Sequence, residues 1–196
     1  MQRPIVNPGK LLWTGQHWIN YIRPFEKSKN SGMISLWYTQ FCEAGEGLVA
    51  FVNIQDETNF QYICTDNERV AAYIQTWMRG RGGLYDMDMP VINADISRKG
   101  DIRSSPAWVI ETATDQIVTT WSDIQQPVIL EAPAPEFHKD RDVYSSLFFA
   151  ESAQILLNDH LISGDPYITD IWQATIGGQR SSCVFALSET FIQVCM

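Results

Sequence analysis

Short apolar runs separated by turn residues make up much of the chain and predict antiparallel β-structure. Early runs cover residues 16–23, 33–41 and 48–54, and the glycine-containing residues 42–47 lie between the second and third of them. Apolar and β-branched runs of this length, bounded by Gly, Asn and Ser, are typical of strands joined by tight turns. We therefore expect an antiparallel hairpin over residues 33–54.

The same rhythm continues after Pro90, so that roughly nine or ten strands are expected in all. The later runs predicted as strands are residues 91–97, 107–123 (a hairpin), 127–131, 143–150, 153–163, 168–176 and 181–194. Asn158 and Asp159 tolerate positive φ and favour a tight hairpin within residues 153–163. A helix over residues 143–161 is the alternative, because Ala, Glu, Gln and Leu recur there at near-helical spacing.

One segment has the pattern of an amphipathic helix. Residues 65–68, Thr-Asp-Asn-Glu, have the form of a capping box, in which the Thr65 hydroxyl and the Glu68 carboxylate satisfy backbone donors. Apolar side chains then recur at helical spacing up to Met78, and Gly80 follows as a stop. We predict a helix over about residues 66–79 that lies on a sheet or across a barrel end.

These elements predict a single mainly β domain over residues 1–196. Nothing rich in Pro, Gly and Ser divides the chain into two patterned halves. Many strands and one capping helix favour an antiparallel β-barrel that resembles the lipocalin and calycin class in architecture. The lipocalin GxW motif is not matched, since residues 15–18 (Gly-Gln-His-Trp) carry an extra residue. A two-sheet β-sandwich is the alternative.

Two acids stand inside the predicted hairpin of residues 107–123, where the strands are otherwise apolar and β-branched. An ionised carboxylate is costly to bury alone, so it points to water, to a partner or into a cavity. A three-residue loop places Glu111, Trp121 and Asp123 on one face, whereas a two-residue loop pairs Trp108 with Trp121 and separates the acids. We predict Glu111 and Asp123 as catalytic acid and base in a cavity, the alternative being that both face solvent.

The charge of the chain argues against some partners. A net charge of −9 and a pI near 4.7 disfavour nucleic-acid binding, which requires a basic surface. The basic groups at residues 79–81 and 98–103 are interpreted as solvated loop charges, with an anion pocket as the alternative. No apolar run has the length of a membrane span or a signal-peptide core. We expect a cytoplasmic protein without membrane or nucleic-acid partners.

The sequence offers no motif for a metal, a nucleotide or a serine nucleophile, so no cofactor and no metal are expected. The four cysteines form no CxxC pair. Residues 138–142 have the spacing His-x-Asp-x-Asp, and His160 could add a ligand, but a charged loop is the favoured interpretation. Residues 80–83 lack the Lys and Ser or Thr of a phosphate-binding loop, and no GxSxG is present.

Seven tryptophans exceed ordinary core needs and suggest a ligand pocket lined by aromatic residues. The predicted pocket-wall residues are Trp37, Tyr38, Trp121, Tyr144 and Trp172. The hypothesis is a barrel that encloses an apolar or aromatic small molecule and binds it or turns it over by cofactor-free acid–base chemistry. The alternatives are a β-sandwich that binds carbohydrate on exposed tryptophans, and an interaction protein that forms homo-oligomers.

Overall fold

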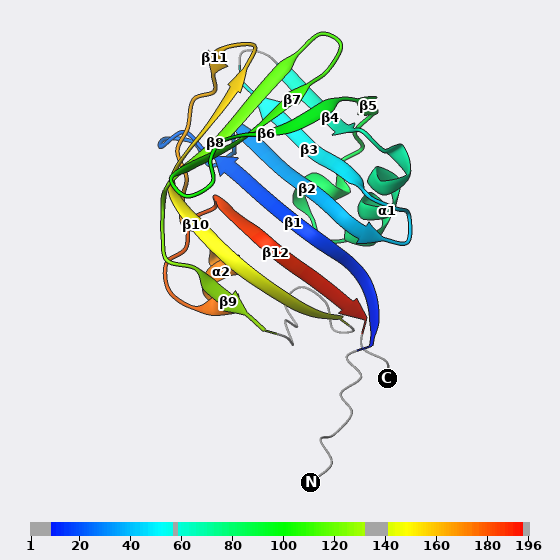
Figure 1. Cartoon of the computed structure of the whole chain (residues 1–196). Helices are drawn as coiled ribbons and strands as arrows, with labels where there is room; N and C mark the ends of the chain where they lie inside the picture. Colours follow the sequence, from blue (N-terminus) through cyan, green and yellow to red (C-terminus); the bar gives the residue numbers. More distant parts are fainter. Residues whose placement is uncertain (1–8, 57–58, 132–140, 194–196) are drawn as a thin grey trace.

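The structure, a computed structural model, describes residues 9–56, 59–131 and 141–193 and consists mainly of one curled sheet (Figure 1). Its strands are β1 (Lys10–Ile22), β2 (Gly32–Cys42), β3 (Gly47–Gln55), β4 (Asn59–Thr65), β5 (Val91–Asn93), β6 (Asp95–Asp101), β7 (Ser105–Glu111), β8 (Gln116–Ile124), β9 (Val128–Leu130), β10 (Arg141–Leu157), β11 (His160–Leu161) and β12 (Val184–Gln193). Its helices are α1 (Glu68–Met78), the short 3-10 helix η1 (Gly83–Asp86) and α2 (Asp170–Ile176). The prediction of a mainly β, barrel-like fold is confirmed, since the sheet curls into a half-barrel.

Ten strands follow one another in the order β5-β4-β3-β2-β1-β12-β10-β8-β7-β6. The long strand β10 belongs to two ladders, because residues 141–149 pair with β12 and residues 150–157 pair with β8. We call the strands from β5 to the first half of β10 the main sheet, and the second half of β10 with β8, β7 and β6 the cover sheet. Only Ala94 separates β5 from β6, and its N–H donates to the carbonyl of Thr65 at 3.0 Å. The strand path therefore returns to its starting edge through one residue.

Both faces of the main sheet are buried. In β3, every residue from Val49 to Ile54 is buried, which an alternating one-sided strand would not show. One apolar cluster packs the cover sheet against one face, and a second packs α1, η1 and α2 against the other. In β1, Trp18 belongs to the first of these clusters and Trp13 to the second. Each main-sheet residue thus faces either the cover sheet or the helices.

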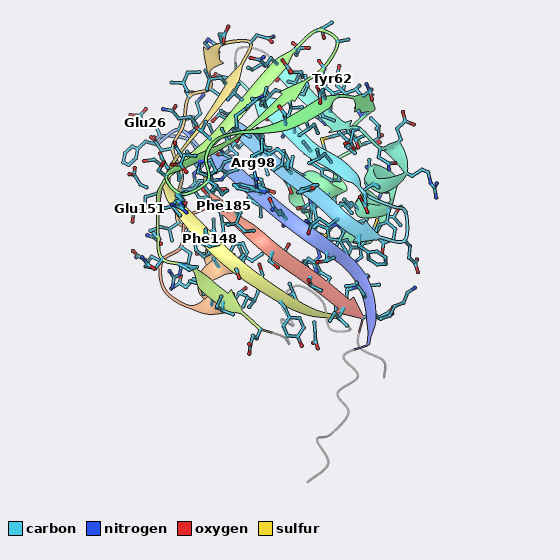
Figure 2. The ribbon with its side chains drawn as sticks, in the orientation of Figure 1. Glu26, Tyr62, Arg98, Phe148, Glu151 and Phe185 are labelled. Carbon is cyan, nitrogen blue, oxygen red and sulfur yellow. The ribbon has the colours of Figure 1, made fainter. Side chains whose placement is uncertain are left out.

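Stacked aromatic rings hold the face toward the cover sheet. Trp18 of β1 stacks on Phe185 of β12 with ring centroids 4.3 Å apart, and Phe185 stacks on Phe148 of β10 at 5.3 Å. Figure 2 shows Phe148 and Phe185 side by side on neighbouring strands. The buried Asn20 amide crosses to the cover sheet, where it donates to Thr119 Oγ1 at 2.9 Å and to two backbone carbonyls at 3.2 Å. Apolar contact and a satisfied polar group together fix the two sheets to each other.

The predicted helix is confirmed at α1, but its cap differs from the capping box expected. Asn67 is the N-cap, and its side chain accepts from the N–H groups of Arg69 and Val70. The Thr65 hydroxyl instead donates to the carbonyl of Leu48 at 2.7 Å and accepts from the Asn67 N–H at 2.9 Å. Thr65 is held in the ladder of β4, so Asn67 caps the helix in place of Thr65.

The elements around the ends of the sheet test two further predictions. The hairpin at Asn158 and Asp159 is confirmed, since both residues have positive φ between β10 and β11, which rules out a helix there. The strand predicted over residues 168–176 is wrong, because residues 170–176 form α2. Gly177 after this segment, with φ of +74°, is a helix-end signal that the β-branched content of the segment obscured. Thr169 is the N-cap residue, but its hydroxyl makes no capping hydrogen bond. The strand β4 was not predicted.

The turn at Asp159 gives a test of this hairpin. Asp159 is exposed and has φ of +63°, a region that costs a β-branched residue energy and suits glycine. We expect Asp159→Gly to be more stable than Asp159→Val by about 1 to 2 kcal/mol in urea unfolding. The same pair at Asp88, which is exposed and lacks a positive φ, is the matched control and should show no such preference for glycine. Equal stability of the two Asp159 variants would contradict the turn assignment.

Candidate functional site

The hairpin containing the predicted acids has a register that neither expected loop gives. Glu111 pairs with Gln116, so residues 112–115 form a four-residue loop and both predicted registers were wrong. The loop is longer because the Thr112 N–H donates to the Asp115 carbonyl at 2.9 Å and the Asp115 N–H donates to Thr112 Oγ1 at 2.9 Å. The ladder can therefore begin only at Glu111 and Gln116.

This register separates the acids from the indole. Trp121 is fully buried toward the main sheet, and its Nε1–H donates to the Ile19 carbonyl at 2.9 Å. Glu111 is exposed, accepts a hydrogen bond from Gln116 at 3.0 Å and lines an open hollow between the β7–β8 loop and strands β4 and β5. Asp123 is exposed, with φ of +52°. The structure does not bring the two carboxylates together, and their catalytic role stays a prediction.

Of the five aromatic candidates, two lie at one cavity. Trp37 and Trp172 line it, whereas Trp121 lies in the cluster under the cover sheet. Tyr38 packs partly buried against that same cluster, and Tyr144 is 40% exposed. The cavity lies on the opposite face of the main sheet from Trp121.

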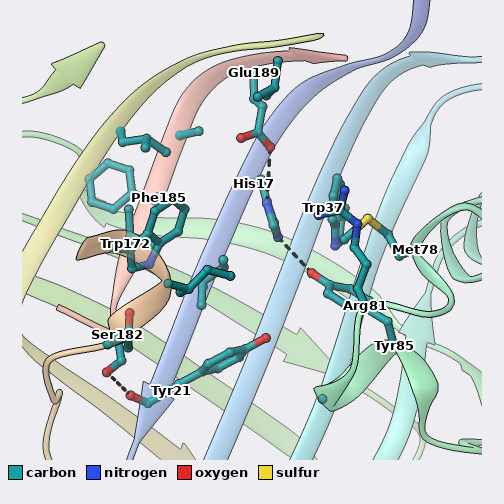
Figure 3. A pocket seen from close by; sticks show the side chains of 18 of the residues that line it. His17, Tyr21, Trp37, Met78, Arg81, Tyr85, Trp172, Ser182, Phe185 and Glu189 are labelled. Carbon is teal, nitrogen blue, oxygen red and sulfur yellow. Dashed lines mark hydrogen bonds and ion pairs between the residues drawn. The ribbon is translucent and has the colours of Figure 1, made fainter. Parts of the chain in front are cut away.

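The cavity has a volume of about 440 Å³ and lies between the main sheet and the helices (Figure 3). β2, β1, β12, β10 and β9 supply its floor, the loop from α1 to η1 closes one side, and α2 closes the other. Most of its lining is apolar or aromatic, and among its few polar groups are His17, Glu189, Tyr85 and Arg81. A concave, mainly apolar space with a few convergent polar groups is typical of small-molecule sites.

A bulge in β12 turns Glu189 into this cavity. Gly15 of β1 pairs with Glu189, but His17 pairs with Ala186, so two residues of β12 lie opposite the single residue Gln16. The same two residues lie opposite one residue of β10. A bulge shifts the alternation by one, which places the side chains of Ala186 and Glu189 both at the cavity. Without it, regular alternation would turn Glu189 to the other face.

His17 and Glu189 form a buried pair on the cavity floor. Nδ1 of His17 lies 3.3 Å from Oε2 of Glu189, and the two side chains are 11% and 8% exposed (Figure 3). The imidazole also stacks on Trp37, with ring centroids 3.8 Å apart. A histidine fixed between a carboxylate and an aromatic ring has few orientations, which is the usual condition of a histidine used in acid–base chemistry.

Ser35 connects His17 to the Tyr85 hydroxyl and to the Trp37 indole. Its Oγ lies 2.9 Å from His17 Nε2 and 2.7 Å from the Tyr85 hydroxyl, and it accepts from Trp37 Nε1 at 3.1 Å. An indole N–H only donates, whereas a serine hydroxyl donates once and accepts twice. One arrangement satisfies these polar atoms: Ser35 accepts from Trp37 and Tyr85 and donates to Nε2. Nδ1 then carries the hydrogen and lies 3.3 Å from Glu189 without a hydrogen bond to it.

Ser35 is a positioning group in this arrangement. The order Ser35, His17 and Glu189 matches a serine–histidine–acid chain, in which serine attacks a carbonyl. The Ser35 side chain is fully buried, however, and its oxygen is occupied by Trp37. An attacking hydroxyl must reach the substrate, so this geometry supports orientation of the imidazole and not nucleophilic catalysis.

Tyr85 and Arg81 lie on the side of the cavity formed by the α1–η1 loop. Burial raises the pKa of Tyr85 well above its ordinary value, so the hydroxyl stays protonated as a hydrogen-bond donor. Burial also lowers the pKa of Arg81 to about 10, an effect that Tyr85 and Glu189 oppose and Arg141 reinforces. Asp86 holds the loop, because its carboxylate accepts from the N–H of Gly80 at 2.6 Å and of Gly82 at 2.7 Å.

Sequence reasoning did not single out His17, Ser35, Tyr85 or Glu189. Each lies in a run that reads as an ordinary strand or loop, and Glu189 reaches the cavity only through the bulge. The basic residues 79–81 were noted, and one of them, Arg81, lines the cavity. A lone acid in an apolar strand was the available signal, and it applied to Glu189 as much as to Glu111.

Other kinds of site receive less support from the described residues. Within residues 9–56, 59–131 and 141–193, no group of three or more His, Cys, Asp or Glu side chains could hold a metal ion. His138, part of the His-x-Asp-x-Asp motif, lies outside the described residues. Neither α1 nor α2 nor η1, the helices of the described part, has the length and apolar character needed to cross a membrane.

Comparison with protein-family models, with curated proteins and with solved structures finds no match for this chain. The functional argument therefore depends on the cavity and its side chains.

The Ser35 hub gives a stability test of the site. We expect Ser35→Ala to lower the free energy of unfolding by about 2 to 4 kcal/mol, because Trp37 Nε1, the Tyr85 hydroxyl and His17 Nε2 lose a buried partner. Urea unfolding followed by tryptophan fluorescence measures this loss. The control Ser104→Ala, at an exposed turn, should change stability by less than about 0.5 kcal/mol. A Ser35→Ala loss as small as the control would contradict the hydrogen-bond assignment.

Proposed function

We propose that the protein binds an apolar or aromatic small molecule in the cavity between the main sheet and the helices, with His17 and Glu189 as its acid–base pair. The volume of about 440 Å³ falls within the range of small-molecule pockets, about 300 to 1,000 Å³. Trp37, Trp172 and Phe191 are among the aromatic groups of the wall. Such walls bury an apolar ligand, and the few polar groups orient it.

The observation that carries the proposal is the buried contact of 3.3 Å between His17 and Glu189 at the floor of this cavity. A carboxylate and an imidazole are costly to bury, and burying them only for stability is seldom favourable. Paired ionisable groups in a mainly apolar cavity are typical of binding and catalytic sites. Their position therefore favours a chemical role.

The reaction class that fits is acid–base turnover. In the proposed reaction, Glu189 accepts a proton from the ligand, and His17 beside it stabilises the charges as they change. Ser35 holds the imidazole in one orientation, and the protonated Tyr85 hydroxyl completes the chain. Isomerisation, hydration, elimination and cyclisation are the reactions that such groups serve without a cofactor.

The carbohydrate alternative has less support. Sugar binding on a flat sheet requires exposed indoles for stacking, but all seven tryptophans lie in the described residues and none is more than 9% exposed. The interaction alternative has exposed side chains to draw on, such as Ile129 and Ile168 at 64% and 53%. Neither supplies a role for the His17–Glu189 pair.

Filling the cavity tests the proposal. Ala186 is buried on the cavity floor, whereas Ala174 is exposed on α2 and serves as the matched control. In native mass spectrometry of freshly purified protein, we expect a retained small molecule in wild type and in Ala174→Phe but not in Ala186→Phe. A thermal melt checks that each variant folds, and Ala186→Leu replaces Ala186→Phe if that variant unfolds. Retention of the same mass by a folded, filled variant would contradict cavity binding.

The acid–base residues are tested with the retained molecule. We expect His17→Gln and Glu189→Gln each to weaken its binding or turnover by about tenfold or more, because each removes a charge-assisted contact. Glu111→Gln and Asp123→Asn test the sequence-based assignment in the same assay, and their exposed carboxylates lead us to expect wild-type behaviour. If binding or turnover were lost in Glu111→Gln and Asp123→Asn but kept in His17→Gln and Glu189→Gln, the functional site would lie on the cover sheet instead.

A further inference from the structure

We propose that the ligand is a neutral molecule with a hydroxyl group, and that this hydroxyl binds between Glu189 and Ser145. The inference rests on the proposed function, since it names the class of molecule that the same cavity takes. It begins with two buried polar atoms that have no hydrogen-bond partner among the described residues, Glu189 Oε2 and Ser145 Oγ.

Glu189 is more than nine-tenths buried and lines the cavity, yet Oε2 accepts no hydrogen bond from the described residues. The nearby Nδ1 of His17, at 3.3 Å, contacts Oε2 without the alignment of a hydrogen bond. A buried carboxylate oxygen left in this state costs free energy, and a donor from a ligand would satisfy it.

Ser145 is the direct neighbour of Glu189 on β10. The two residues are register partners in the β10–β12 ladder, so their side chains point to the same face. Ser145 is 5% exposed, and Val143 and Leu147 on either side of it in the alternation of β10 both line the cavity. Ser145 is not itself a lining residue, but its unsatisfied hydroxyl lies on the same face of the sheet as the unsatisfied carboxylate of Glu189, directly beside that lining residue.

The chemistry of the two atoms selects a hydroxyl. A carboxylate only accepts hydrogen bonds, whereas a serine hydroxyl both donates and accepts. A ligand hydroxyl can donate to Glu189 and accept from Ser145 at once. An ether or ketone oxygen cannot donate, so it would leave Glu189 unsatisfied.

Charge argues against ionised ligands at this position. A carboxylate ligand placed against Glu189 would meet a like charge in a poorly hydrated site. A cationic ligand would meet Arg81, which lines the cavity and interacts electrostatically with Glu189. A neutral donor meets neither repulsion.

Three probes with one ring system test this inference. We expect 2-naphthol to bind at least about tenfold more tightly than 2-methoxynaphthalene and 2-naphthoate, measured by isothermal titration calorimetry at neutral pH. In Glu189→Gln the preference for 2-naphthol should fall to about threefold or less, and Ser145→Ala should reduce it in part. Glu46→Gln, at an exposed turn, is the control and should keep the full preference.

Each outcome decides one point. Equal binding of 2-naphthol and 2-methoxynaphthalene would overturn the hydroxyl inference while leaving the cavity as a binding site. Tightest binding of 2-naphthoate would overturn it in favour of an anionic ligand. Unchanged preference in a folded Glu189→Gln would overturn the assignment of the hydroxyl to this residue. Failure of all three probes to bind would remove the proposed function as well.

Discussion

The burial of both faces of the main sheet is the constraint on which the rest of the structure depends. In a strand with two buried faces an unpaired polar side chain is costly, so most polar groups there have a partner or lie at a cavity. Asn20 finds carbonyls of the cover sheet, and Ser35 finds His17, Tyr85 and Trp37. The polar groups on the two faces thus have different roles, one joining sheets and the other shaping a site.

Alternation along β1 and β12 decides which role each residue has. His17 and Trp18 are adjacent in the chain, yet Trp18 stacks on Phe185 under the cover sheet and His17 lies at the cavity. The bulge in β12 decides that the Glu189 side chain points to the cavity face of the sheet. A shift of the register by one residue in either strand would separate His17 from Glu189, so the geometry of the site depends on the register of the ladder.

The sequence predicts most elements of the fold, for reasons that are local. Apolar runs and turn residues identify the strands, helical spacing identifies α1, and the Asn158–Asp159 pair identifies a hairpin. Residues 168–176 were misassigned because their β-branched side chains outweighed the helix-end signal of Gly177. This error concerns a short segment whose conformation depends on its neighbours in the fold.

The site could not be predicted in the same way because its members come together only through non-local pairing. Trp37 and Trp172 were named from the abundance of aromatics, and both line the cavity. Glu111 was chosen because the hairpin was given the wrong register, which depends on the Thr112–Asp115 loop. Glu189 was missed because it reaches the cavity through a bulge that alternation alone does not reveal. Both are one-residue effects, and a pattern with a period of two cannot resolve them.

The single-residue link at Ala94 limits which parts of the structure can move. The cover sheet is continuous with the main sheet along β10 at one edge and through Ala94 at the other, so it cannot swing away as a flap. The cavity lies on the other face of the main sheet, so a molecule reaches it from the helical side. The glycine-containing loop ahead of η1, fastened by Asp86, and the short helix α2 are the two elements that border the cavity on that side.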